Sequence, residues 1–173
     1  MRVVTVPVLA VFLALASSVP AHALSINWDA APKPIPDLAM VDRGGEAVAL
    51  DRFAGRVVVL NLWATWCAPC RREMPSLAAL QEAFPEAALT VVALALDRAS
   101  FDELDDFMAE VGASNLLVLQ DASMASARAL DVPGLPATLV VDRDGAERFR
   151  HLGYADWSTA DVIAALQAFV DAD

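Results

Sequence analysis

The sequence is an acidic chain of 173 residues with a formal net charge of −11 at pH 7 and two cysteines. Because phosphate groups repel so acidic a surface, the composition argues against a nucleic-acid-binding protein. Cys67 and Cys70 are also too few and too close together for a disulfide-stapled scaffold, since closing so short a loop removes little chain entropy.

The first 23 residues have the layout of a secretory signal peptide. Arg2 precedes an apolar block over residues 3–16, and small residues lead to Ala21-His22-Ala23, an A-x-A cleavage site. The block is shorter than the ~20 residues of a membrane-spanning helix, so we expect cleavage after Ala23. An uncleaved signal would instead anchor the domain to the membrane. The signal predicts a periplasmic or secreted protein in an oxidising compartment.

Residues 24–36 are predicted to form a proline-rich tether, because Pro32, Pro34 and Pro36 favour an extended path and disfavour a regular ladder. One domain, residues 37–173, follows the tether. A turn signal at residues 42–45 lies between apolar flanks at 38–41 and 47–50. These flanks are predicted to form a short N-terminal β-hairpin that covers one end of the sheet.

Apolar patterns along the rest of the chain alternate between strands and helices. Near-continuous apolar runs predict buried strands, and three-residue spacing predicts helices. The predicted strands are residues 57–63, 89–96, 116–119, 137–141 and 146–152. The predicted helices begin at the cysteine pair, at a Ser100–Glu103 capping box, at Ser123 and at Ser158. This order predicts an α/β domain with a central mixed sheet, parallel in its core and antiparallel at one edge, flanked by helices.

The cysteine pair is predicted to lie at the start of a helix. Pro69 suits the first turn of that helix, which leaves Cys67 at the N-terminus, where the dipole and free N–H groups stabilise a thiolate. Cys70, one turn later, should be more buried. Cys67 would then attack a partner disulfide, and Cys70 would resolve the mixed disulfide. The alternatives are a structural disulfide, half of a zinc site and a pair that holds copper.

The cysteines belong to a longer pattern that resembles a known family. Residues 60–70, Leu-Asn-Leu-Trp-Ala-Thr-Trp-Cys-Ala-Pro-Cys, are followed by Arg-Glu-Met-Pro at 72–75 and Gly-Leu-Pro-Ala-Thr at 134–138. Matching residues also occur at 36–38, 55–58, Asp142 and Gly145. The chain is similar to the TlpA-like and ResA-type proteins of the thioredoxin-fold family over nearly all of residues 36–173. The resemblance implies a thioredoxin-like fold.

The resemblance also implies a substrate-binding surface beside the cysteines. Pro136 matches the cis-proline that faces the cysteine pair in this family, and Leu135 would offer backbone groups to a substrate strand. The alternative is an ordinary turn proline at 136, with Pro133 as the rival cis position. Trp66 would shield Cys67 and offer partners an apolar surface, or would pack in the core.

A proton-transfer residue is implied at Glu73, which matches a glutamate close to the cysteines of ResA-type and TlpA-like proteins. Partial burial would raise its pKa and let it exchange the proton of Cys70. The alternative is a solvated glutamate in the first turn of the helix. Asn61 occupies the strand position where ordinary thioredoxins hold a buried aspartate, and an amide cannot titrate. This departure makes Glu73 the better candidate.

By resemblance, the chain is an extracytoplasmic thiol–disulfide oxidoreductase without a cofactor or a metal. The implied partners are protein thiols and disulfides, with a membrane electron donor that re-reduces Cys67 and Cys70. The implied role is a reductant in cytochrome c maturation or in copper-centre assembly. A disulfide-introducing oxidant and a Cu(I) metallochaperone that binds through the cysteine pair remain as alternatives.

Overall fold

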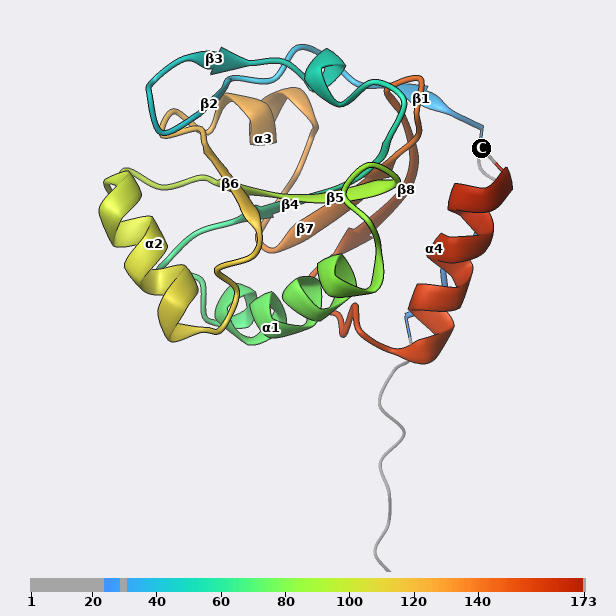
Figure 1. Ribbon diagram of the computed structural model, residues 1–173. Coiled ribbons are helices and arrows are strands. Elements are labelled where there is room, and N and C mark those ends of the chain that lie inside the picture. Colours follow the sequence, from blue (N-terminus) through green and yellow to red (C-terminus); the bar gives the residue numbers. More distant parts are fainter. Residues whose placement is uncertain (1–23, 29–30, 173) are drawn as a thin grey trace, which may run out of the picture.

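The computed structural model describes residues 24–28 and 31–172, which contain one sheet with helices on both faces (Figure 1). Its strands lie in the order β1-β8-β7-β4-β5-β6-β2-β3. The predicted signal peptide, residues 1–23, lies outside the described residues. The strands are β1 (Lys33–Pro34), β2 (Met40–Val41), β3 (Ala47–Val48), β4 (Val57–Trp63), β5 (Leu89–Ala95), β6 (Leu117–Gln120), β7 (Ala137–Val141) and β8 (Ala146–Leu152).

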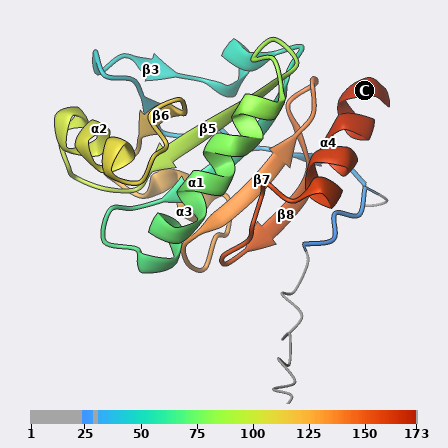
Figure 2. The same cartoon turned by 60° about the horizontal axis from the view of Figure 1, so that its bottom comes forward.

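The strands alternate with helices along the chain, as the apolar patterns predict. These are the short 3-10 helix η1 (Leu50–Phe53) and the α-helices α1 (Ala68–Ala83), α2 (Phe101–Glu110), α3 (Ala125–Ala129) and α4 (Ala160–Ala172). The predicted capping box begins α2, because Ser100 accepts from the Glu103 N–H while the Glu103 carboxylate accepts from the Ser100 N–H. Figure 2 shows α1 lying across one face of the sheet, between α2 and α4.

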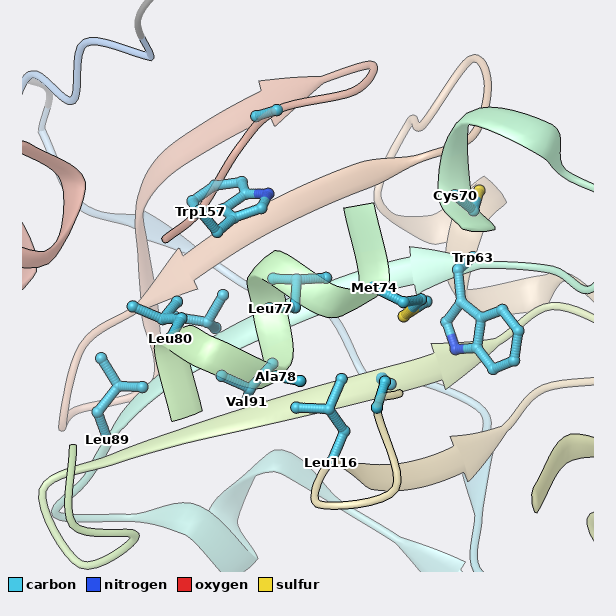
Figure 3. Packing of buried hydrophobic residues seen from close by; sticks show 14 of the residues in the cluster. Trp63, Cys70, Met74, Leu77, Ala78, Leu80, Leu89, Val91, Leu116 and Trp157 are labelled. Carbon is cyan, nitrogen blue, oxygen red and sulfur yellow. The ribbon is translucent and has the colours of Figure 1, made fainter. Parts of the chain in front are cut away.

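Two hydrophobic cores lie on the two faces of the sheet, because successive side chains of a strand point to opposite sides. On β4, Val57, Val59 and Trp63 belong to the core under α1, α2 and α4, part of which Figure 3 shows. The intervening residues Val58, Leu60 and Leu62 belong to the other core, with residues of α3 and the β2–β3 hairpin. Asn61 therefore points to the same face as Trp63, toward α1.

The register of the central strands brings distant segments to one edge of the sheet. β4 pairs in parallel with β5 and antiparallel with β7, where Leu62 lies opposite Ala137. β7 in turn pairs antiparallel with β8, where Ala137 lies opposite Leu152. The end of β4, the start of β7 and the end of β8 therefore meet beside the start of α1. This edge holds the cysteine pair.

The N-terminal segments differ in part from their predicted arrangement. The hairpin forms, with Met40 opposite Val48, but it extends the sheet beyond β6, which pairs with β2. In the segment expected to be a tether, Lys33–Pro34 pairs with β8, and Trp28 stacks on Phe169 at 4.2 Å between ring centroids. A proline is tolerated in β1 because an edge strand pairs on one side only. Within residues 24–28 and 31–172, no helix is long and apolar enough to cross a membrane.

Candidate active site

Cys67 and Cys70 are joined by a disulfide at the N-terminus of α1, with their Cα atoms 5.3 Å apart. Cys67 is the N-cap residue, and its Sγ accepts a hydrogen bond from the Cys70 N–H at 3.3 Å. Cys70 is fully buried, whereas 5% of Cys67 is exposed. Cys70 is therefore the more buried of the two cysteines, as the sequence predicts. After reduction, the same N–H and the helix dipole would favour a thiolate at Cys67.

The loop before the cysteines is held by Asp97, which follows the end of β5. Its Oδ2 accepts hydrogen bonds from the Thr65 backbone N–H at 2.9 Å and from the Thr65 Oγ1 at 2.5 Å. Burial alone would raise the pKa of Asp97, but these hydrogen bonds, together with those from the Ala99 and Arg98 N–H groups, outweigh it and hold the pKa below its usual value. The next residue, Trp66, is 66% exposed, so the structure excludes the core alternative for this side chain.

The peptide bond between Leu135 and Pro136 is cis, as the resemblance implies, and it is the one cis bond among the described residues. Pro136 directly precedes β7, so the β4–β7 register brings it to the edge that holds Cys67. The Pro136 carbonyl accepts from the Gly153 N–H at 2.8 Å. Among the described residues, the backbone N–H and C=O of the half-buried Leu135 have no hydrogen-bond partner.

Glu73 is completely buried under the cysteine pair, which excludes the alternative of a solvated glutamate. Its Oε1 accepts from the Asn61 side-chain amide at 2.7 Å, and its Oε2 accepts from the Ala155 N–H at 3.3 Å. The Asn61 amide also donates to Thr138 Oγ1 at 2.9 Å, while the Asn61 Oδ1 is buried without a protein partner. We call Asn61, Glu73 and Thr138 the buried polar cluster.

Burial raises the pKa of Glu73 from its ordinary value of 4.5 to about 7. The hydrogen bonds from Asn61 and Ala155, and the nearby Trp157 indole, oppose this shift but do not cancel it. A carboxyl group that titrates near neutral pH can both accept and return a proton under physiological conditions. The pKa of Glu73 is therefore shifted upward by burial, in the direction that the sequence analysis predicts.

Other parts of the site come from segments that the sequence pattern does not connect to the cysteines. Thr138 belongs to the proline-loop motif, and only the β4–β7 register brings it to Asn61. The connection between β8 and α4 supplies Ala155 to Glu73, and the Trp157 N–H donates to Ser76 Oγ of α1 at 3.1 Å. No local pattern marks these backbone donors. Within the described part of the chain, no three His, Cys, Asp or Glu residues form a group that could hold a metal.

Comparisons with known proteins show the family of the chain. The chain matches the Redoxin family over residues 30–166. It is 30% identical over 110 residues to the thiol-disulfide oxidoreductase ResA of Bacillus subtilis. This match covers 64% of this chain and 60% of ResA. It is 33% identical over 119 residues to the thioredoxin-like protein YneN of the same organism, over 68% of this chain and 69% of YneN.

A solved structure agrees with the fold as well. A protein from Chlorobium tepidum, described as a thiol:disulfide interchange protein DsbE, has a TM-score of 0.67 and 32% identity, over 82% of this chain and 96% of that chain. The predicted thioredoxin-like fold and the predicted relationship to ResA-type proteins are confirmed. With a family match that extends from β1 to α4, the chain belongs to the Redoxin family.

Proposed function

We propose that this protein is an extracytoplasmic thiol–disulfide oxidoreductase that reduces disulfides of specific partner proteins. The observation that carries the proposal is the order of groups along one helix. Cys67 caps the N-terminus, Cys70 is buried one turn later, and Glu73, with a pKa of about 7, lies buried one turn further on. These three positions supply a nucleophile, a resolving thiol and a proton acceptor in sequence.

The first step is the attack of the reduced Cys67 on the partner. Its thiolate attacks one sulfur of the partner disulfide, the S–S bond breaks, and the second partner sulfur leaves as a thiolate. The backbone N–H and C=O of Leu135 would pair with the partner strand, and exposed Trp66 would add apolar contact. The product is a mixed disulfide between Cys67 and the partner.

The second step resolves this intermediate. The Cys70 thiol gives its proton to the Glu73 carboxylate, and the Cys70 thiolate attacks the Cys67 sulfur. The Cys67–Cys70 disulfide forms as the bond between Cys67 and the partner breaks, and the partner sulfur that was bonded to Cys67 leaves as a thiolate, so that two electrons have passed to the partner. Glu73 returns its proton to solvent or to the leaving thiolate. A dithiol of a membrane electron donor would then reduce Cys67–Cys70 by the reverse sequence of steps.

The direction and the location of the reaction rest on the sequence. The signal-like residues 1–23 support export. Resemblance to TlpA-like and ResA-type proteins supports a reductant of apocytochrome c or of a copper-centre assembly factor. A reductant of this kind should have a reduction potential of roughly −200 mV or lower, whereas a potential near about −120 mV would identify an oxidant.

Trapping of the mixed disulfide tests the proposal. A Cys70→Ser variant, expressed with its signal in the native cell, should accumulate partners linked through Cys67 that a reducing agent releases. A variant that also carries Cys67→Ser is the matched control and should trap none. Recovery of no partner through Cys67 would contradict the exchange mechanism. Failure of the purified wild type to reduce insulin, together with stoichiometric Cu(I) binding, would favour the metallochaperone.

A further inference from the structure

An arginine and a tyrosine form an exposed pair beside the active site. The Arg72 guanidinium, two residues after Cys70, lies over the Tyr154 ring at 5.5 Å from its centroid. Tyr154 is 49% exposed, and Arg72 is exposed as well. Within residues 24–28 and 31–172, no carboxylate forms an ion pair with Arg72. The tyrosine therefore orients a cation whose charge is available to another molecule.

The charged groups around Arg72 have partners within the chain, whose net charge is −11. Arg71, one residue earlier, pairs with Glu110 at 2.9 Å and lies over the Phe107 ring. The nearby acids are also engaged within the chain. Asp97 accepts from Thr65, and Asp156 accepts from the N–H and the Oγ of Ser158. Arg72 alone among these groups has an aromatic support and no acidic partner.

Backbone hydrogen bonds fix the pair next to the cis-proline. The Gly153 N–H donates to the Pro136 carbonyl, and the Ala155 N–H donates to the buried Glu73. Tyr154, between these two anchors, is thereby held between the proline loop and the second turn of α1. Leu152, which is 48% exposed, precedes it at the end of β8. A strand bound at Leu135 would pass this surface.

We propose that Arg72 and Tyr154 form a docking platform for an acidic side chain of the partner polypeptide, close in sequence to the target cysteine. The inference rests on the proposed function and adds the chemistry of its substrate. The carboxylate of a partner Asp or Glu would pair with the Arg72 guanidinium, and the exposed side chains of Leu152 and Trp66 would offer apolar contact to neighbouring partner residues. Charge complementarity of this kind selects partners and raises the association rate.

The probe is a pair of disulfide-bonded peptides that differ only beside each cysteine, where one carries Glu and the other carries Lys. The reduced wild type should react with the Glu peptide about two- to fivefold faster at low salt, the range expected for an exposed ion pair. The preference should shrink at high salt. Arg72→Gln should abolish it, Arg72→Lys should retain part of it, and Tyr154→Leu should weaken it.

Arg71→Gln is the matched control, because it changes the net charge equally one residue away and should keep the preference. Equal rates of the wild type with both peptides would overturn the docking platform while leaving the proposed function intact. Reduction of neither peptide would instead contradict the proposed function. If Arg72→Gln slows both peptides equally, or shifts the reduction potential of the cysteine pair, Arg72 acts on the cysteines and the docking platform is wrong.

Discussion

The pKa values of two buried carboxylates, Asp121 and Glu73, are shifted in opposite directions, although both side chains are nearly inaccessible to water. Asp121, 3% exposed, accepts hydrogen bonds from the backbone N–H groups of Ser123 and Ser126 and from the Ser123 hydroxyl, at 2.6–3.0 Å. Burial alone would raise its pKa, but these donors outweigh burial and lower it. Glu73 has one strong donor, Asn61, and a longer one, the Ala155 N–H, and burial raises its pKa to about 7.

Asp121 also lies in a less deeply buried environment than Glu73, so the number of donors and the depth of burial together set the direction of each pKa shift. Asp121 stays ionised and holds the start of α3, the helix that begins four residues later. Glu73 is under-solvated in its ionised form, so that the neutral and charged forms have similar free energies near pH 7. The comparison supports the proposed proton transfer from Cys70.

Glu73→Gln tests this contrast with the largest expected effect. The variant keeps a buried polar side chain but cannot accept the Cys70 proton, so resolution of the mixed disulfide should slow about 100-fold at pH 7. The wild-type rate should rise with pH through about 7 as Glu73 ionises, and the variant should lose that inflection. Rapid mixing of a preformed mixed disulfide measures the step.

Asp121→Asn is the control, because it also neutralises a buried carboxylate but lies outside the proposed site. Its resolution rate and pH profile should match those of the wild type. An equal loss of rate in both variants would indicate that general destabilisation, rather than proton transfer, slows the reaction.

The free energy of unfolding should respond to pH with opposite signs in the same two variants. Glu73 has a raised pKa, so relative to Glu73→Gln the wild type should lose roughly 3 kcal/mol as pH rises from 4.5 to above 7, where the loss levels off. Asp121 has a lowered pKa, so its advantage over Asp121→Asn should be complete above about pH 4 and should be lost as pH falls below it. Urea denaturation of the oxidised proteins across this range measures both. Parallel pH curves for the two variants would contradict the contrast.

Removal of the strong donor to Glu73 should have the smallest effect. Asn61→Leu deletes the hydrogen bond that lowers the pKa of Glu73, so this pKa should rise further, by about one pH unit. Thr138→Val is the control, because it leaves the Asn61–Glu73 bond in place. Carboxyl NMR titration measures the shift. An unchanged pKa in Asn61→Leu would show that Asn61 does not stabilise the ionised form.

Much of the fold could be predicted because its signals are local. The apolar runs at β4, β7 and β8 match the observed strands residue for residue, and the capping box fixes the start of α2. The edges of the sheet were less predictable. Proline density at residues 32–36 indicates an extended chain but not a partner, and only the free edge of β8 gives Lys33–Pro34 its place.

Local sequence is enough to place the cysteine pair at the start of a helix and to bury Cys70, because helix initiation and apolar spacing depend on neighbours a few residues apart. The contact of Asn61 with Thr138, 77 residues away, arises only in the folded chain, as do the contacts of Glu73 with Ala155 and of Arg72 with Tyr154. Strand register and helix packing set these contacts. Neither leaves a periodic trace in the chain, yet together they control the pKa of Glu73.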